Sequence, residues 1–218
     1  MSAIDGPSYS SLTADGVGDY LAAASRYIVA VHSIQAVSGW GFGWTPSWQD
    51  TTPTPAAWAR SLVAGGLASL HSLGSEFGEA IEETFSGVSC VTIHRDVKPT
   101  HFIRNPQGLH LLDWEQAARG PAALDTGNLI FSCLATSFEN GSPVDTRTAA
   151  RALDRAGCLL HSERQIVVAI AWKALVWGQY HVGADLVAVR RIVDALLDTW
   201  SVSSAVTTVA SALTRGKS

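Results

Sequence analysis

The sequence predicts a mainly helical protein that carries one small β-hairpin, an α+β fold. Three observations support this class. Apolar residues recur at helical spacing over most of the chain, an apolar run from Val88 to Ile93 has the length of a strand, and turn formers separate two further short strands after it. With 218 residues, 47% of them hydrophobic, the chain can bury one well-packed core. We expect a flexible tail over residues 1–12 and a single domain over residues 13–218.

The first predicted helix begins near Thr13, which can cap it, and it ends shortly after His32. Val17, Leu21 and Ile28 fall on one face of this helix, so that face should pack against the core. At the end of such a helix, His32 is expected to be a hydrogen-bonded residue.

A glycine and tryptophan segment, Gly39–Trp44, comes next. It has the glycine content of a phosphate-binding loop, but no strand leads into it and no helix opens at its end. We therefore interpret it as a loop, and its tryptophans as possible lining for a substrate cleft. Two helices should follow, from Trp58 to Leu73 and from Glu76 to Phe85.

The second half of the chain is predicted to be helical. The run from Glu163 to Gln179 is apolar nearly all round, so it should be the central buried helix. The other helices expected here are Asp125–Phe138, Thr146–Ala156, Asp185–Trp200 and Ala205–Arg215.

Composition excludes several classes of function. A net charge of −4 does not indicate binding to nucleic acid or to an anionic membrane surface. The three cysteines share no close spacing, which is typical of buried thiols in a reducing compartment. No signal peptide is visible, and Lys173 interrupts the most apolar run, Ile166–Tyr180, which is too short to span a bilayer. We expect a cytoplasmic protein. Twelve of its fifteen basic residues are arginine, which favours a GC-rich bacterial source.

The chemistry is concentrated in the loop after the predicted strand, which carries Asp96, Lys98 and His101. The strand-forming runs Phe102–Arg104 and Leu109–Leu112 flank four turn-forming residues and should form a hairpin. Such a hairpin returns Asp113 to the neighbourhood of Asp96. Two carboxylates beside a lysine and a histidine can hold a divalent cation and place a base near a hydroxyl, as phosphoryl transfer requires.

Three segments resemble a known superfamily. The run His94–His101 resembles the catalytic loop of protein kinases, H-R-D-x-K-x-x-N. Leu112–Glu115 resembles the metal-binding segment of the aminoglycoside phosphotransferase and choline kinase superfamily, and Ala118–Asp125 resembles the glycine turn and aspartate that follow it. The resemblance implies the carboxy-terminal lobe of a protein-kinase-like fold.

The resemblance also implies ATP and Mg²⁺ as cofactors and gives each site residue a role. By position, Asp96 matches the catalytic base and Lys98 matches a phosphate-contacting lysine. His101 matches the asparagine that binds metal and cofactor, Asp113 matches the principal metal ligand, and Glu115 matches a second acidic metal ligand. Asp125 matches an aspartate that braces the catalytic loop.

The chain departs from the family pattern at two points. Position 101 is histidine instead of asparagine, and imidazole suits zinc, iron or copper better than it suits magnesium. No lysine precedes Lys98, so we expect no counterpart here of the amino-terminal lobe, with its glycine loop and its phosphate-pairing lysine. We expect a second polypeptide to supply that lobe.

Three hypotheses of function stay open at this point. In the first, the chain is one subunit of an ATP-dependent kinase that phosphorylates a hydroxyl of a small molecule, or of peptide Ser/Thr, in bacterial specialised metabolism. In the second, it is a pseudokinase-like scaffold that binds a partner, a peptide or an intermediate without phosphorylating it. In the third, the cleft catalyses a cyclisation or elimination in natural-product biosynthesis, with Asp96 or His101 as the acid or base. His94 is interpreted in all three as a core histidine that supports the loop.

Overall fold

The computed structural model describes residues 6, 8–9, 16–33, 71–141, 162–180 and 186–215. Its helices and strands are α1 (Gly16–His32), α3 (His71–Phe85), β1 (Cys90–Ile93), β2 (Phe102–Asn105), β3 (Gly108–Leu111), β4 (Ala118–Pro121), α4 (Ala123–Glu139), α6 (Glu163–Tyr180), α7 (Leu186–Thr199) and α8 (Val202–Arg215). Two single 3₁₀ turns, Pro99–His101 and Trp114–Gln116, lie between strands. The predicted class, mainly helical with a β-hairpin, is confirmed. Within these ranges, none of the helices is both long and apolar enough to cross a membrane.

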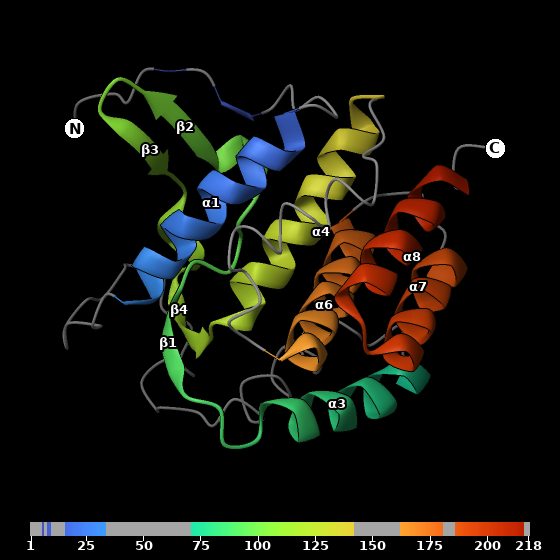
Figure 1. The fold of residues 1–218 in the computed structure, drawn as a ribbon. Helices are drawn as coiled ribbons and strands as arrows, with labels where there is room; N and C mark the ends of the chain where they lie inside the picture. The colour runs from blue at the N-terminus through green and yellow to red at the C-terminus, as the bar shows by residue number, and fades with distance from the viewer. Residues whose placement is uncertain are drawn as a thin grey trace.

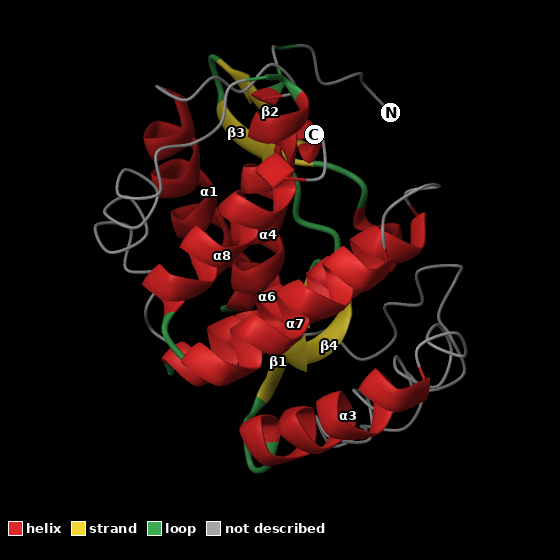
Figure 2. Ribbon diagram, turned by 90° about the vertical axis from the view of Figure 1, so that its right-hand side faces the viewer, coloured by secondary structure: helices red, strands yellow, loops and turns green. Residues whose placement is uncertain are grey.

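Helix α4 lies in the middle of the molecule (Figure 1). Helices α6, α7 and α8 pack together on one side of it, while α1 and the two strand pairs lie on the other. Viewed from the α7 side, α3 lies at one end of the molecule, next to β1 and β4 (Figure 2). The catalytic loop expected from the sequence is therefore held between the central helix and the strands.

The core is centred on α4 and α6, as the apolar character of the 163–179 run predicts. Every side chain from Ile166 to Ala171 is buried, and so is every residue from Ala123 to Ala135. A helix that is apolar on all sides is stable only when it is surrounded by other elements. Lys173 is the one charged side chain in the middle of α6, and its side chain is only 12% exposed.

Close contact between α4 and α6 depends on Gly127. A Cβ atom at this position would lie 2.6 Å from the carbonyl carbon of Ala169 and 2.7 Å from the backbone nitrogen of Ile170. The two backbones therefore pass each other at a distance that admits only glycine. Because Lys173 lies one turn beyond Ala169 on α6, this crossing also sets the position of Lys173 relative to α4.

The strands form two separate antiparallel pairs. Strand β2 pairs with β3, with Phe102 opposite Leu111, and this confirms the predicted hairpin. Strand β1 pairs with β4, with Ile93 opposite Ala118. We did not predict β4, because its glycine and proline are residues that strands usually lack.

Helix boundaries differ from the predictions in places. The break that we expected between Leu73 and Glu76 is wrong, since α3 runs without interruption from His71. Glycine weakens a helix only modestly, and the buried side chains of Phe77, Ile81 and Phe85 hold α3 to the core. Helix α8 begins at Val202, three residues before the expected start. The loop at 39–44, the helix start near 13, the helix at 146–156 and most of that at 58–73 lie outside the described residues.

The described part of the expected tail contacts the fold. Ser8 forms an isolated antiparallel bridge with Ile103 of the hairpin. The ring of Tyr9 lies 4.8 Å from that of Tyr20 on α1, measured between centroids, and the Arg104 guanidinium lies over Tyr9 at 5.7 Å. Aromatic contacts of this kind stabilise a segment against a domain, and the flexible tail expected over residues 1–12 stays a prediction.

We predict that Gly127→Ala lowers the free energy of unfolding by about 1–3 kcal/mol, because the new methyl group forces the α4 and α6 backbones apart. Gly78→Ala on α3 is the matched control, since a Cβ there meets nothing within 4 Å. That control should raise stability by up to about 1 kcal/mol, the usual advantage of alanine over glycine in a helix. Urea unfolding measures both variants; equal effects would contradict the close crossing.

Candidate active site

The loop from His94 to His101 leaves the end of β1 and passes over the beginning of α4. It enters this position because β1 pairs with β4, and α4 begins directly after β4. The amino-terminal turn of α4 therefore faces the loop backbone. This arrangement places Asp125, in the first turn of α4, beneath the loop.

Asp125 makes three hydrogen bonds, and two of them hold the loop. Its fully buried carboxylate accepts the backbone N–H groups of His94 and Arg95, both at 2.8 Å. It also pairs with His32 Nε2 at 3.1 Å, so the last residue of α1 joins the same cluster. The hydrogen-bonded histidine expected at the end of the first helix is thus confirmed.

Arg95 adopts a left-handed backbone conformation, with φ of 70°. Such a conformation is unfavourable for a residue with a Cβ atom and persists only where the surroundings fix it. Here the fixing contacts come from α4, because Asp125 binds the Arg95 N–H and the Asn128 side-chain amide donates to the Arg95 carbonyl. The turn at Arg95 precedes Asp96, whose carboxylate then meets Lys98 and Lys173.

His94 connects the loop to the segment that carries Asp113. Its Nε2 donates to the Leu112 carbonyl at 2.8 Å, and its Nδ1 accepts the Asp96 N–H at 3.3 Å. Burial lowers the pKa of His94, so the ring is neutral at pH 7 and can make both bonds at once. His94 therefore supports the loop, as the sequence interpretation expects.

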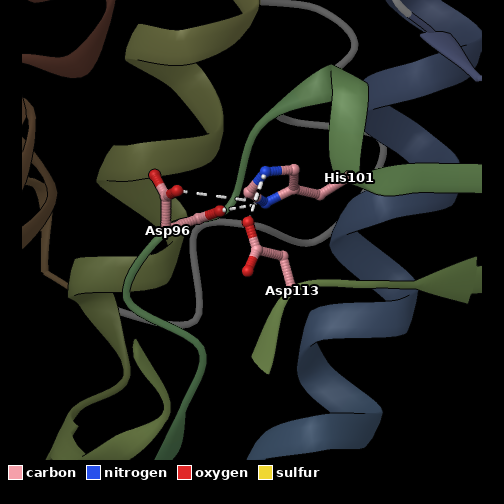
Figure 3. Close-up of side chains that lie close together, drawn as sticks. All are labelled: Asp96, His101 and Asp113. Carbon is pink, nitrogen blue, oxygen red and sulfur yellow. Dashed lines mark hydrogen bonds and ion pairs between the residues drawn. The ribbon is translucent and has the colours of Figure 1, made fainter. Parts of the chain in front are cut away.

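The hairpin brings Asp113 back to the loop. Leu112 donates its N–H to the His101 carbonyl at 2.9 Å, directly beyond the end of β3. Asp113 then adopts a left-handed conformation, with φ of 62° and ψ of 57°. Its Oδ2 lies 3.0 Å from His101 Nε2, and one ligand atom from each of Asp96, His101 and Asp113 lies within 4.8 Å of the others (Figure 3).

The orientation of His101 leaves one ring nitrogen with a lone pair. Nδ1 lies 3.0 Å from the backbone carbonyl oxygen of Asp96, an acceptor, so Nδ1 carries the proton and donates it there. Burial, and then the charge of Lys98, lower the pKa of His101, so the ring is neutral at pH 7. Nε2 therefore presents a lone pair toward Asp113 Oδ2. Two carboxylates and such a nitrogen fit a divalent cation, since this type of backbone bond commonly orients a metal-ligating histidine.

Two lysines neutralise Asp96. Lys98 Nζ lies 2.8 Å from Oδ2, and Lys173 Nζ, from α6, lies 2.9 Å from Oδ1. Burial raises the pKa of Asp96, but the two ammonium groups outweigh burial, and the pKa falls to about 2. Asp96 is therefore a carboxylate at every physiological pH.

The structure brings together four of the five residues predicted for the site: Asp96, Lys98, His101 and Asp113. The fifth, Glu115, is exposed on a 3₁₀ turn and lies outside the three-residue cluster, so its role as a metal ligand stays a prediction. Sequence reasoning missed Lys173, which it treated only as an interruption of an apolar run. A single lysine within an otherwise apolar central helix was the available signal, because such a lysine needs a buried partner.

Comparisons with known proteins agree with this geometry. The sequence model of the phosphotransferase enzyme family, APH, matches residues 1–165. No curated protein sequence matches the chain.

Several solved kinases share the fold. An ethanolamine kinase from Plasmodium vivax superposes with a TM-score of 0.57 at 12% identity, covering 99% of this chain and 63% of that one. The choline kinase LicA from Streptococcus pneumoniae gives a TM-score of 0.51 at 16% identity, covering 94% and 65%. A choline/ethanolamine kinase family protein from Mesorhizobium loti gives 0.52 at 14% identity, covering 93% and 69%.

At these identities the likeness concerns the fold, and the chain spans less than two thirds of the length of the first two kinases. The predicted resemblance is confirmed by both comparisons. Since the family model covers well over half of its residues, the chain belongs to the phosphotransferase enzyme family.

Proposed function

We propose that this protein transfers the terminal phosphoryl group of ATP to a hydroxyl group of an acceptor, with the help of a divalent cation. The observation that carries the proposal is the cluster of Asp96, His101 and Asp113, three ligand atoms within 4.8 Å of one another beside Lys98. A catalytic carboxylate, a cation site and a lysine are the parts that phosphoryl transfer needs.

Asp113 and His101 would hold the cation. The chemistry that Mg²⁺ or Mn²⁺ would supply there is neutralisation of the charge that develops on the phosphates. In the reaction, the bond between the γ-phosphorus and its bridging oxygen breaks and a bond to the acceptor oxygen forms. ADP leaves, and the hydroxyl proton passes to Asp96 and then to solvent.

Asp96 acts mainly by orienting the acceptor. A carboxylate with a pKa of about 2 is a weak base, but it remains a strong hydrogen-bond acceptor for a hydroxyl group. In a loose transition state the hydroxyl loses its proton late, so alignment contributes more than basicity. Lys98, which pairs with Asp96 Oδ2, would stabilise negative charge on the transferred phosphoryl group.

The nucleotide requires further contacts beyond this cluster. The fold is shared with LicA in complex with AMP, at a TM-score of 0.52, which supports a nucleotide as the phosphoryl donor. We propose that a glycine loop and a phosphate-pairing lysine come from a second polypeptide. The acceptor would be a small molecule or a peptide Ser/Thr, in bacterial specialised metabolism.

One observation favours a second candidate, a binding module without phosphoryl transfer. Lys173 occupies Oδ1 of Asp96, one of the two oxygens that an acceptor hydroxyl would use. In a module of this kind, the ion pair would be permanent and the cleft would bind a peptide or an intermediate. The two candidates differ in whether nucleotide and metal bind together.

We predict that calorimetric titration shows ATP binding that requires a divalent cation. Asp113→Ala should weaken binding at least about tenfold, because it removes a ligand of the cation. Titrations with magnesium, manganese and zinc test the metal preference that His101 confers. Glu79→Ala, an exposed carboxylate on α3, is the matched control, and Glu115→Ala tests the remaining predicted ligand.

Wild-type affinity in the control and a loss in Asp113→Ala would support phosphoryl transfer. Binding that persists without metal, or in Asp113→Ala, would contradict the proposed cation site. No binding with any of the three metals would favour the binding module.

The depressed pKa of Asp96 predicts how stability depends on pH. A carboxyl whose pKa is lower in the folded state stabilises the fold above its unfolded pKa, and that contribution disappears as pH falls through the folded pKa. Because the pKa falls from an ordinary value of 3.8 to about 2, the loss of stability on acidification is about 2 kcal/mol. Urea unfolding in EDTA at several pH values between 5 and 2 should show this loss in the wild type. Asp96→Asn should lack it, and an identical pH slope in both proteins would refute the two-lysine environment.

A further inference from the structure

Two of the three lysines in the whole sequence converge on one carboxylate, that of Asp96. Lys98 is part of the loop motif, so its position near Asp96 follows from that motif. Its side chain is 39% exposed. Lys173 comes from α6, 77 residues further along the chain, and its side chain is 12% exposed. Its presence in the site is a property of the tertiary fold that the loop motif does not explain.

Lys173 interrupts an apolar part of α6. Its neighbours along α6, from Ile166 to Ala171 and then Ala174 and Leu175, are all buried and apolar. An ammonium group that is only 12% exposed is stabilised by an anionic partner. In the part of the chain that the structure describes, that partner is Asp96.

Lys173 and the cation cluster lie on different oxygens of Asp96. Oδ2 accepts from Lys98 and lies 4.0 Å from His101, so it faces the cluster that would hold the metal and the phosphates. Oδ1 is the oxygen that pairs with Lys173. Lys173 therefore lies on the side of Asp96 that is farther from the cluster.

An acceptor hydroxyl that binds Asp96 must compete with Lys173 for the carboxylate. When the hydroxyl takes Oδ1, the ammonium loses part of its only described counter-charge, and an apolar or cationic acceptor would leave it unpaired. An acceptor that carries its own anionic group restores the pairing. We propose that Lys173 binds a carboxylate or phosphate of the acceptor, and that the acceptor is an anionic hydroxyl compound.

The geometry limits the size of this compound. Lys173 Nζ lies 2.9 Å from Asp96 Oδ1, and hydrogen bonds from each group reach about 3 Å. The acceptor hydroxyl and the anionic oxygen therefore lie within about 9 Å of one another. Small hydroxy acids and short hydroxyalkyl or sugar phosphates satisfy this limit. The inference rests on the proposed phosphoryl transfer, since only an acceptor needs to meet Asp96.

Calorimetry on the wild-type chain in EDTA, without nucleotide, tests ligand class first. Glycerate carries a carboxylate and glycerol 3-phosphate carries a phosphate, so they represent the two kinds of anionic acceptor. Glycerol is the matched neutral compound, and choline and ethanolamine are the cationic compounds. We expect the anionic compounds to bind at least about tenfold more tightly than glycerol, since a charged hydrogen bond is made only by them. The stronger of the two anionic compounds identifies the carboxylate or the phosphate as the preferred group.

Lys173→Met then tests the residue, because methionine keeps most of the side-chain volume and removes the charge. It should weaken binding of the preferred anion at least about tenfold without weakening that of glycerol, and Lys173→Arg should restore much of the anion affinity. Arg191→Met is the control, since it removes one positive charge from an exposed position on α7. Thermal unfolding of each variant checks folding, and the wild-type ranking stands even where a variant is unstable.

Several results would overturn the inference: choline or ethanolamine binding more tightly than the anions, no anion binding at millimolar concentration, or equal anion affinity in Lys173→Met and the wild type. A Lys173→Met variant that loses ATP and metal binding instead would place the lysine on the phosphate side and also overturn it. If the anions do not bind, while ATP still binds and its binding depends on Asp113, only the proposed acceptor class is rejected. Anion binding without any ATP binding favours the binding module over the kinase proposal.

Discussion

The buried carboxylate of Asp125 is the interaction on which the site depends. It accepts two consecutive backbone N–H groups, those of His94 and Arg95, and also contacts His32 at the end of α1. Without it, the buried His94 donor and the part-buried Arg95 donor would lose their partner, at a cost of up to about 1–3 kcal/mol each. The left-handed turn at Arg95 would also lose its support. One carboxylate thus links α1, α4 and the loop, and it sets the direction in which Asp96 leaves the turn.

Helix packing sets the charges of the site just as directly. Asp125 and Asn128 project from α4 to the loop, and Lys173 projects from α6 to Asp96. The relative position of these groups depends on how closely the two helices cross, and that distance is set at Gly127. The most apolar part of the protein and its most polar cluster are therefore parts of one arrangement. A change in the distance between α4 and α6 would therefore alter the ion pairs of Asp96.

The parts of the structure that local sequence determines were predictable. The loop motif, the hairpin with its turn at 105–108 and the buried helix from 163 each follow from residues that are near one another in the chain. The contact of Lys173 with Asp96 spans 77 residues, and β4 exists because β1 is available as a partner. Neither leaves a periodic pattern that could be recognised in advance. Glu115 had a plausible position in sequence, but the left-handed turn at Asp113 leaves its side chain exposed and outside the cluster.

The most direct test of the cation site is pulsed electron paramagnetic resonance of Mn²⁺ bound with ATP. The account predicts a nitrogen coupling from an imidazole that is bonded directly to manganese, at a distance of about 2.0–2.3 Å. The coupling should disappear in His101→Asn and persist in His110→Asn, whose ring lies on the hairpin and bonds Asn105. A manganese signal without imidazole coupling in the wild type, or coupling that survives in His101→Asn, would contradict the site formed by Asp96, His101 and Asp113.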